Sequence, residues 1–214
     1  MTLLTCTSFI SALILVSPEP PEAACSLEGS VTVMNAEGEE EAPAFAEVYI
    51  ANASLGSPAA PSRHTMIQRN TQFEPRALVV QVGDTVDFRN EDSEPHEVHS
   101  SRIVNAFDVK RENSKELTYS KLFLETGVSH IGCQIHSNMS AIILAVPNAF
   151  HAHVNEKGMW KISGLPKREL EVVFWEAGGE KVKQKLTPCV SPPTQVVLPV
   201  TVRRSTSTYG VKFQ

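Results

Sequence analysis

The 214-residue sequence lacks the features that define several large classes of protein. No apolar run reaches the roughly 18 residues that a membrane-spanning helix needs, and no segment has helical periodicity of useful length. Lys and Arg are absent before Arg63 and the net charge is −5, which argues against a nucleic-acid partner. No nucleophile elbow or motif of paired acid and base is present, so we predict no catalytic residues and no enzyme activity.

The N-terminal segment predicts export from the cytoplasm. Residues 3–16 form an apolar run that is too short to span a bilayer, and SPEPPEAAC follows it. This pattern indicates a signal peptide over residues 1–24, and hence a periplasmic or secreted protein without a transmembrane segment after cleavage. The signal is atypical, because it lacks Lys and Arg at its start and Glu22 interrupts the small residues before the cleavage site. Lipid attachment at Cys25 is the weaker alternative, since no Leu stands three residues before it.

Cysteine is scarce, and the four positions differ in context. Cys6 lies in the predicted signal peptide, and Cys133 lies in a motif typical of metal ligands. Cys25 and Cys189 remain, and they can pair in an oxidising compartment.

Short β-rich runs separated by Gly, Pro and Asn recur along the chain and predict an all-β sandwich or barrel. The Ser-, Pro- and Gly-rich residues 52–64 predict a loop or linker. The polar residues 105–118 predict a long loop or an edge. The runs that we expect to be strands are 30–34, 46–50, 77–82, 85–90, 97–100, 121–125, 141–146, 170–175 and 194–200.

The strongest functional signal is the segment Cys133-Gln-Ile-His136-Ser-Asn-Met139, which lies between two predicted strands. It brings a thiolate, an imidazole and a thioether into seven residues. Sulfur with imidazole favours copper, and two His, one Cys and a weak axial Met make the type 1, or blue, copper site. Zinc is the competing metal, but structural zinc sites usually use more than one Cys and do not use a thioether.

A second imidazole must come from elsewhere, and His96 is the best candidate. Side chains alternate across a strand, so a core-facing Val98 would place His96 inward and His99 outward. His151 and His153 also share one strand face and can form a surface metal pair. An exposed pair without function is the simpler interpretation of these two residues.

Two motifs support a family resemblance. FEPRALVVQVGDTVDFRNEDSEPHEVH has a Gly-Asp turn before V-x-F-x-N and Pro-His, and GCQIHSNM spaces its ligands by two residues. On these motifs, residues 72–146 resemble a small cupredoxin of the plastocyanin–amicyanin branch. The resemblance implies a Greek-key β-sandwich, with the ring edge of His136 as the electron port. It implies one copper ion with the ligands His96, Cys133, His136 and Met139.

One residue departs from this pattern. The family usually has Asn directly after the first ligand His, where it connects the two ligand loops, and this sequence has Glu97. The departure puts in question the hydrogen bonds around the ligands, which tune the redox potential of such a site.

The flanking segments resemble a different family. SLEGSVTVMNAEGEEEAPAFAEVYI and GMWKISGLPKRELEVVFWEAGG are similar to parts of a carboxypeptidase-regulatory, or prealbumin-like, domain. The whole arrangement is similar to bacterial methylamine-utilization-type proteins. It implies a discontinuous prealbumin-like sandwich of residues 25–60 and 147–214, with a cupredoxin domain of residues 65–146 inserted in it or packed beside it. We therefore expect residues 26–55 to contact the 160–200 region across a shared sheet.

Together these features predict an exported blue copper protein that carries single electrons between redox protein partners, which the sequence does not identify. A copper-carrying or copper-sensing protein without electron transfer would use the same ligands. A third hypothesis is an interaction module with a structural metal. Only the basic C-terminal region supports it, with ten Lys and Arg against four Asp and Glu from Lys157 onward.

Overall fold

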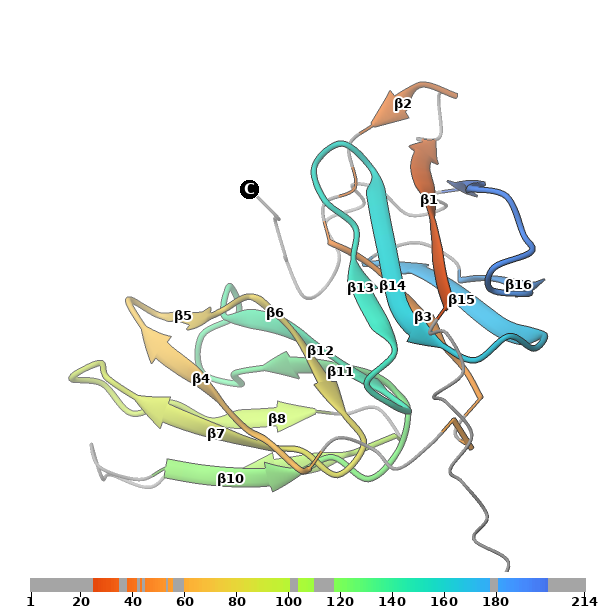
Figure 1. The fold of residues 1–214 in the computed structure, drawn as a ribbon. Helices are drawn as coiled ribbons and strands as arrows, with labels where there is room; N and C mark the ends of the chain where they lie inside the picture. Colours follow the sequence, from red (N-terminus) through yellow and green to blue (C-terminus); the bar gives the residue numbers. More distant parts are fainter. Residues whose placement is uncertain are drawn as a thin grey trace, which may run out of the picture.

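The computed structural model describes residues 25–199, except 35–37, 42, 44, 53, 56–59, 101–103, 110–117 and 178–180. Every regular element in this part of the chain is a β-strand, and the strands form four sheets. No helix among the described residues is long and apolar enough to cross a membrane. The predicted signal peptide lies outside the described residues. Figure 1 shows the sheets arranged as two sandwiches that lie against each other.

One sandwich, which we name the central sandwich, is built from residues 63–146. Its first sheet has the strand order β10-β7-β4-β5 and its second the order β6-β12-β11-β8-β9. Buried side chains from both sheets, including Phe73, Phe88, Phe123 and Ile143, form one apolar core between them. The strands are β4 (Arg63–Arg69), β5 (Gln72–Glu74), β6 (Ala77–Gln81), β7 (Thr85–Asn90), β8 (Val98–Ser100), β9 (Phe107–Val109), β10 (Thr118–Leu122), β11 (Gly127–Gly132) and β12 (Ser140–Val146).

The other sandwich, which we name the flanking sandwich, combines strands from both ends of the described chain. Its sheets have the orders β14-β1-β17, with β2 beside β1, and β13-β3-β15-β16. Leu27, Val48, Trp160 and Phe174 belong to its separate core. The strands are β1 (Cys25–Met34), β2 (Glu40–Glu41), β3 (Ala46–Ile50), β13 (His151–His153), β14 (Met159–Leu165), β15 (Leu170–Glu176), β16 (Val182–Leu186) and β17 (Thr194–Pro199).

Strand β1 joins the two ends of the chain. It pairs antiparallel with β14 and parallel with β17, and it makes no pair with the strands of the central sandwich. A Cβ atom at Gly29 would lie 1.9 Å from the carbonyl oxygen of Thr194, so the close approach of β17 requires glycine there. These pairings confirm the predicted contact between residues 26–55 and the 160–200 region.

The disulfide that we considered from the cysteine positions is present. Cys25, in β1, is bonded to Cys189, which follows β16, so the bond connects the two sheets of the flanking sandwich. The bond closes a loop with a sequence separation of 164 residues. In the chain-entropy model such a loop stabilises the fold by roughly 5 kcal/mol.

The two sandwiches share a third apolar cluster, which stacks the four sheets into layers. Strand β12 is buried on both faces: Ile143 faces the core of the central sandwich, while Ile142 and Leu144 face the flanking sandwich. There they meet Tyr49 and Trp175, which come from β3 and β15. Burial on both faces explains why residues 141–146 form a continuous apolar run rather than an alternating one.

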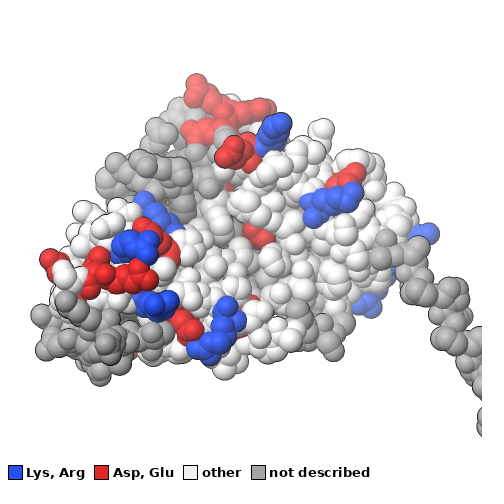
Figure 2. Space-filling view, turned by 60° about the vertical axis from the view of Figure 1, so that its left-hand side comes forward, with Lys and Arg blue, Asp and Glu red and all other residues white. Residues whose placement is uncertain are grey.

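Positively and negatively charged side chains are interspersed on the face of the molecule that Figure 2 draws. On the face drawn in Figure 2, basic and acidic side chains are mostly neighbours rather than parts of one extended patch. Ion pairs such as Arg63–Asp87, Arg69–Glu91 and Lys161–Glu28 have this character. Exposed pairs of this kind contribute little to stability.

Most predicted strands lie where the sequence placed them, and the differences have local causes. Residues 46–50 and 85–90 form β3 and β7 with the predicted bounds. The expected loop 52–64 ends early, because β4 begins at Arg63 beside β7. Strand β10 begins and ends three residues earlier than the predicted run 121–125. Leu124 is 64% exposed although it is apolar, which is how the apolar pattern misled the prediction.

A buried aspartate fixes the turn between β6 and β7. The carboxylate of Asp84 accepts hydrogen bonds from the backbone N–H groups of Ser62 and Gln81, at 2.7 and 2.8 Å, and pairs with His64 Nε2 at 2.9 Å. Burial acts to raise the pKa of Asp84, but the three hydrogen bonds outweigh it and hold the pKa below the usual value. Asp84 therefore connects the start of β4 to the turn that leads into β7.

We expect Asp84→Asn to reduce the free energy of unfolding at pH 7 by about 1–3 kcal/mol, because an amide replaces one acceptor by a donor. A depressed pKa stabilises the fold above the unfolded value, near pH 4, and this contribution disappears as pH falls through the folded pKa. The difference between the two proteins should therefore shrink in acid. Urea unfolding at pH 7 and pH 3 measures it, with Asp108→Asn, on an exposed edge strand, as the control. Equal stability at pH 7 would contradict the role given to Asp84.

Candidate metal centre

The loop between β11 and β12 brings its side chains to one end of the central sandwich. Cys133 directly follows β11, and Met139 directly precedes β12. The N–H of Cys133 donates to the carbonyl of Met139 at 3.2 Å, and the N–H of Met139 donates to the carbonyl of His136 at 3.0 Å. These two bonds close the loop tightly. Cys133 and Met139 are both buried in the core of the central sandwich.

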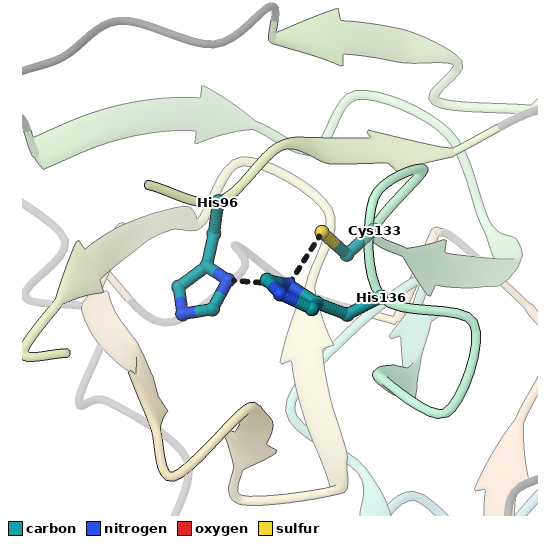
Figure 3. Close-up of side chains that lie close together, drawn as sticks. All are labelled: His96, Cys133 and His136. Carbon is teal, nitrogen blue, oxygen red and sulfur yellow. Dashed lines mark hydrogen bonds between the residues drawn. The ribbon is translucent and has the colours of Figure 1, made fainter. Parts of the chain in front are cut away.

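Three potential ligand atoms converge at this loop. His96 Nδ1 lies 3.1 Å from His136 Nδ1, and Cys133 Sγ lies 3.8 Å from the same His136 atom. All three ligand atoms lie within 4.8 Å of one another. Figure 3 shows that the His96 ring comes from the β7–β8 loop and meets the other two side chains across the end of the sandwich. Among the described residues this is the one group of His, Cys, Asp and Glu with such geometry.

Each imidazole turns its Nδ1 inward and its Nε2 toward a carboxylate. His96 Nε2 lies 2.8 Å from Asp92 Oδ2, and His136 Nε2 lies 3.6 Å from Glu94 Oε2. A carboxylate at Nε2 favours the tautomer with the proton there, which leaves the inward Nδ1 free to accept or to ligate. The two acids differ in setting, because the side chain of Asp92 is 14% exposed and that of Glu94 is 64% exposed.

Asp92 also holds the neighbouring hairpin. Its two oxygens accept hydrogen bonds from the N–H groups of Asn70 and Thr71, at 2.6 and 2.9 Å. Both residues have positive φ, as in the two-residue turns that suit β-hairpins, and they connect β4 to β5. Burial acts to raise the pKa of Asp92, but the bonds from Thr71, His96 and Asn70 outweigh it, and the pKa lies below the usual value.

The β7–β8 loop that carries His96 is held from within. Asn90, the last residue of β7, donates to the carbonyl of Glu94 at 2.7 Å and accepts from the N–H of Asp92 at 2.9 Å. Farther along, the N–H of Glu97 donates to Cys133 Sγ at an N···S distance of 3.5 Å. The two ligand loops are therefore connected through the backbone of residue 97. This contact does not require the Asn side chain that the family usually has at that position.

The donor set and its burial fit copper. One thiolate and two imidazoles meet, and Met139 is buried in the same core as Cys133. Soft sulfur with imidazole is the ligand combination that copper prefers. The side chain of His96 is fully buried and that of His136 is 28% exposed, so His136 is the ligand candidate that reaches solvent. The cluster is consistent with a type 1 copper site.

The structure also refines how the sequence positioned these residues. His96 lies in the loop two residues before β8 rather than on the strand, although it is buried as expected. His99 pairs in register with Gly132, where its ring covers the glycine, and it stays outside the cluster. Sequence reasoning missed Asp92 and Asn90. The one signal that could have pointed to Asp92 is its place four residues before the candidate ligand His96.

Comparisons with known proteins give likenesses of limited extent. No protein-family model and no curated protein matches the chain. A reduced tryptophan-to-tyrosine variant of amicyanin is 27% identical over 46% of this chain and 97% of its own, with a TM-score of 0.37. An oxidised methionine-to-leucine variant of amicyanin is 25% identical over 47% and 98%, with a TM-score of 0.36. A purple cupredoxin from Nitrosopumilus maritimus is 23% identical over 38% and 98%, with a TM-score of 0.35.

These likenesses extend over less than half of the chain, and their TM-scores are low. They do not identify the second module, so its likeness to a prealbumin-like domain stays a prediction. The chemistry of the metal centre follows from the geometry of its own residues.

We expect Asp92→Ala to weaken metal binding about 10- to 100-fold, because His96 loses the partner that fixes its ring and tautomer. Competition with a chelator of known affinity for Cu(II) measures the change. Glu94→Gln is the matched control. It removes the charge of the carboxylate that lies 3.6 Å from His136 Nε2. Because the Glu94 side chain is exposed to solvent, the affinity for Cu(II) should change less than about threefold. Equal effects of the two substitutions would contradict the positioning role of Asp92.

Proposed function

We propose that the chain is a type 1 copper protein that carries single electrons between redox partners. One observation carries the proposal: the thiolate of Cys133 and the Nδ1 atoms of His96 and His136 converge at one end of a β-sandwich. A ligand set that mixes one thiolate with two imidazoles suits copper better than zinc. Copper bound there would supply a reversible one-electron couple between Cu(I) and Cu(II).

The residues of the chain have distinct tasks in this proposal. Cys133 supplies the thiolate, and the N–H of Glu97 donates to its sulfur and so stabilises the negative charge. His96 and His136 supply the imidazoles, and Asp92 orients the first of them. Met139, which is 1% exposed, would supply its thioether as a weak fourth ligand. Because the surrounding hydrogen bonds already fix these side chains, a change of charge would require little rearrangement.

Electron exchange is proposed to pass through the edge of His136. It is the candidate ligand with a substantially exposed side chain, at 28%, and the adjacent Ile135 is 44% exposed. An exposed apolar residue beside the imidazole suits brief contact with a redox protein, since it is desolvated easily and makes no demand for a specific charge partner. The partner is proposed to be another redox protein, met outside the cytoplasm, where the Cys25–Cys189 disulfide is stable.

Electron carriage is favoured over copper carriage by the burial of the ligands. His96, Cys133 and Met139 are 8%, 6% and 1% exposed, so exchange of the ion with a donor protein has access mainly past His136. With four ligands from the protein, no position would stay open for a substrate, which argues for a carrier rather than an oxidase.

The visible spectrum tests the copper proposal. The protein loaded with Cu(II) should be intensely blue from charge transfer between the Cys133 thiolate and the metal, and a reductant should bleach it reversibly. Cys133→Ser should lose the colour but remain folded, because the core of the central sandwich consists of apolar side chains. Circular dichroism of the same samples checks the fold. A colourless Cu(II) complex of the unaltered protein would overturn the assignment, and blue protein that no reductant bleaches would favour copper carriage.

We further propose that the central sandwich is an inserted domain, with boundaries near residues 65 and 146, in a flanking domain of residues 25–60 and 147–214. Two observations support this division. Each sandwich has its own core, and no backbone ladder joins their sheets in the described part of the chain. Arg63 begins β4 and the N–H of Ser62 binds Asp84, so an isolated domain needs a start a few residues earlier than 65.

A fragment of residues 60–147 should fold cooperatively and bind copper with the same spectrum as the whole chain. Its outer face would expose Ile142 and Leu144, which the flanking sandwich covers in the intact protein. We therefore expect a tendency to associate, reduced by Ile142→Thr and Leu144→Thr. Thermal unfolding and sedimentation measure both properties. A soluble fragment without a cooperative transition, with or without these substitutions, would contradict the division into domains.

A further inference from the structure

Three chemically reactive side chains lie together in the flanking sandwich, in a different module from Cys133. His151 and His153 belong to β13, an edge strand, and Glu47 belongs to the neighbouring β3. The register pairs His153 with Glu47 directly. His151 lies two residues before His153, so all three side chains share one face of the sheet.

Glu47 is the unusual member, because it is a carboxylate with only 1% exposure. Its Oε1 accepts a hydrogen bond from His151 Nδ1 at 2.6 Å. Its Oε2 is buried without a hydrogen-bond partner, and the nearest ion-pair partner is His153 Nδ1 at 3.4 Å. Among the described residues, no Lys or Arg forms an ion pair with Glu47. A buried carboxylate with an unsatisfied oxygen is costly, so the arrangement calls for a cation.

Asp84, which pairs with His64, is a buried carboxylate whose two oxygens both have hydrogen-bond partners, and it can be compared with Glu47. Asp84 is also buried and also contacts an imidazole, but two backbone N–H groups donate to it as well. Within the described part of the chain, no backbone N–H donates to Glu47 Oε2, and a second imidazole lies near that oxygen instead. The difference indicates that the Glu47 cluster is built for a ligand, not only for folding.

The surroundings of the cluster are closed on one side and open on the other. The ring of Phe45 lies 5.5 Å from that of His153 and 6.0 Å from that of Trp175, which belongs to the apolar cluster between the two sandwiches. The side chains of His151 and His153 are 28% and 58% exposed. An ion can therefore enter from solvent, and water can complete its coordination.

We propose that Glu47, His151 and His153 form a second metal site, which takes a divalent ion such as Zn²⁺. Two imidazoles and one carboxylate are a recurrent zinc ligand set in which a position stays open for water. As the side chains lie, their ligand atoms do not all fall within 4.8 Å of one another. His153 Nδ1 already lies 3.4 Å from Glu47 Oε2, so binding requires the His153 ring to turn toward His151 as well, which its 58% exposure permits. The ion would then bridge β3 and β13 beside the contact between the two sandwiches.

The test is a titration of the full chain with Zn²⁺ by calorimetry, in a Cys133→Ser, His136→Ala background that removes two residues of the first cluster. The background protein should bind one Zn²⁺ per chain. His151→Ala and His153→Ala should each weaken binding at least tenfold, since even loss of a partner to a ligand costs 10- to 100-fold. His64→Gln is the matched control, because it alters an imidazole beside a buried carboxylate, and it should leave the affinity unchanged.

Glu47→Gln distinguishes a three-residue site that includes Glu47 from adventitious binding by His151 and His153 alone. It should weaken binding as much as the loss of an imidazole does, and an unchanged affinity would mean adventitious binding and overturn the proposal. The proposal is also overturned if His153→Ala binds Zn²⁺ as tightly as its parent does. X-ray absorption of the Zn²⁺-loaded background protein keeps the test decisive if Glu47→Gln does not fold. The proposal requires two imidazoles and at least one further oxygen ligand on zinc, and fewer imidazoles would overturn it. None of these results depends on whether the first cluster binds copper.

Discussion

The burial of β12 on both faces is the constraint on which the rest of the molecule depends. Ala141, Ile143 and Ala145 close the core of the central sandwich, while Ile142, Leu144 and Val146 pack against side chains of β3 and β15 in the flanking sandwich. A strand held from both sides has no freedom to slip, because a shift of one residue would exchange its two sets of apolar side chains. The strand begins directly after Met139, so the same packing that joins the sandwiches also fixes one end of the ligand loop.

Hydrogen bonds from both backbone and side-chain groups position the candidate ligands of the metal centre. Two backbone bonds close the ligand loop, and the N–H of Glu97 reaches Cys133 Sγ from the opposite loop. Asp92 then connects the β4–β5 turn to His96. The β7–β8 loop thus holds both His96, through Asp92, and Cys133, through the N–H of Glu97. These contacts position the candidate ligands before an ion binds, which is what the proposed electron carriage would require of the protein.

The flanking sandwich solves a different problem, which is the stability of a sandwich made from two distant segments. The pairing of β1 with β14 and β17 and the Cys25–Cys189 bond both connect the first described residues to the last. They reduce the entropy cost of leaving a whole sandwich between the two segments. The same sandwich places Glu47 under two imidazoles at the rim of the contact between modules.

The β-rich class, most strands and the candidate ligands could be predicted from the sequence, because strand alternation and the spacing of Cys133, His136 and Met139 are local properties. The pairing of Cys25 with Cys189 could be considered by elimination. The role of Asp92, the backbone contact at Glu97 and the burial of Glu47 depend on distant segments, and they are visible only in the folded protein. Nothing in the run AEVYI shows that its Glu faces another sandwich, since a charged residue between apolar ones normally faces water. Burial is a property of what packs around a strand, and such partners can lie far away in the chain. His151, which contacts Glu47, is 104 residues away.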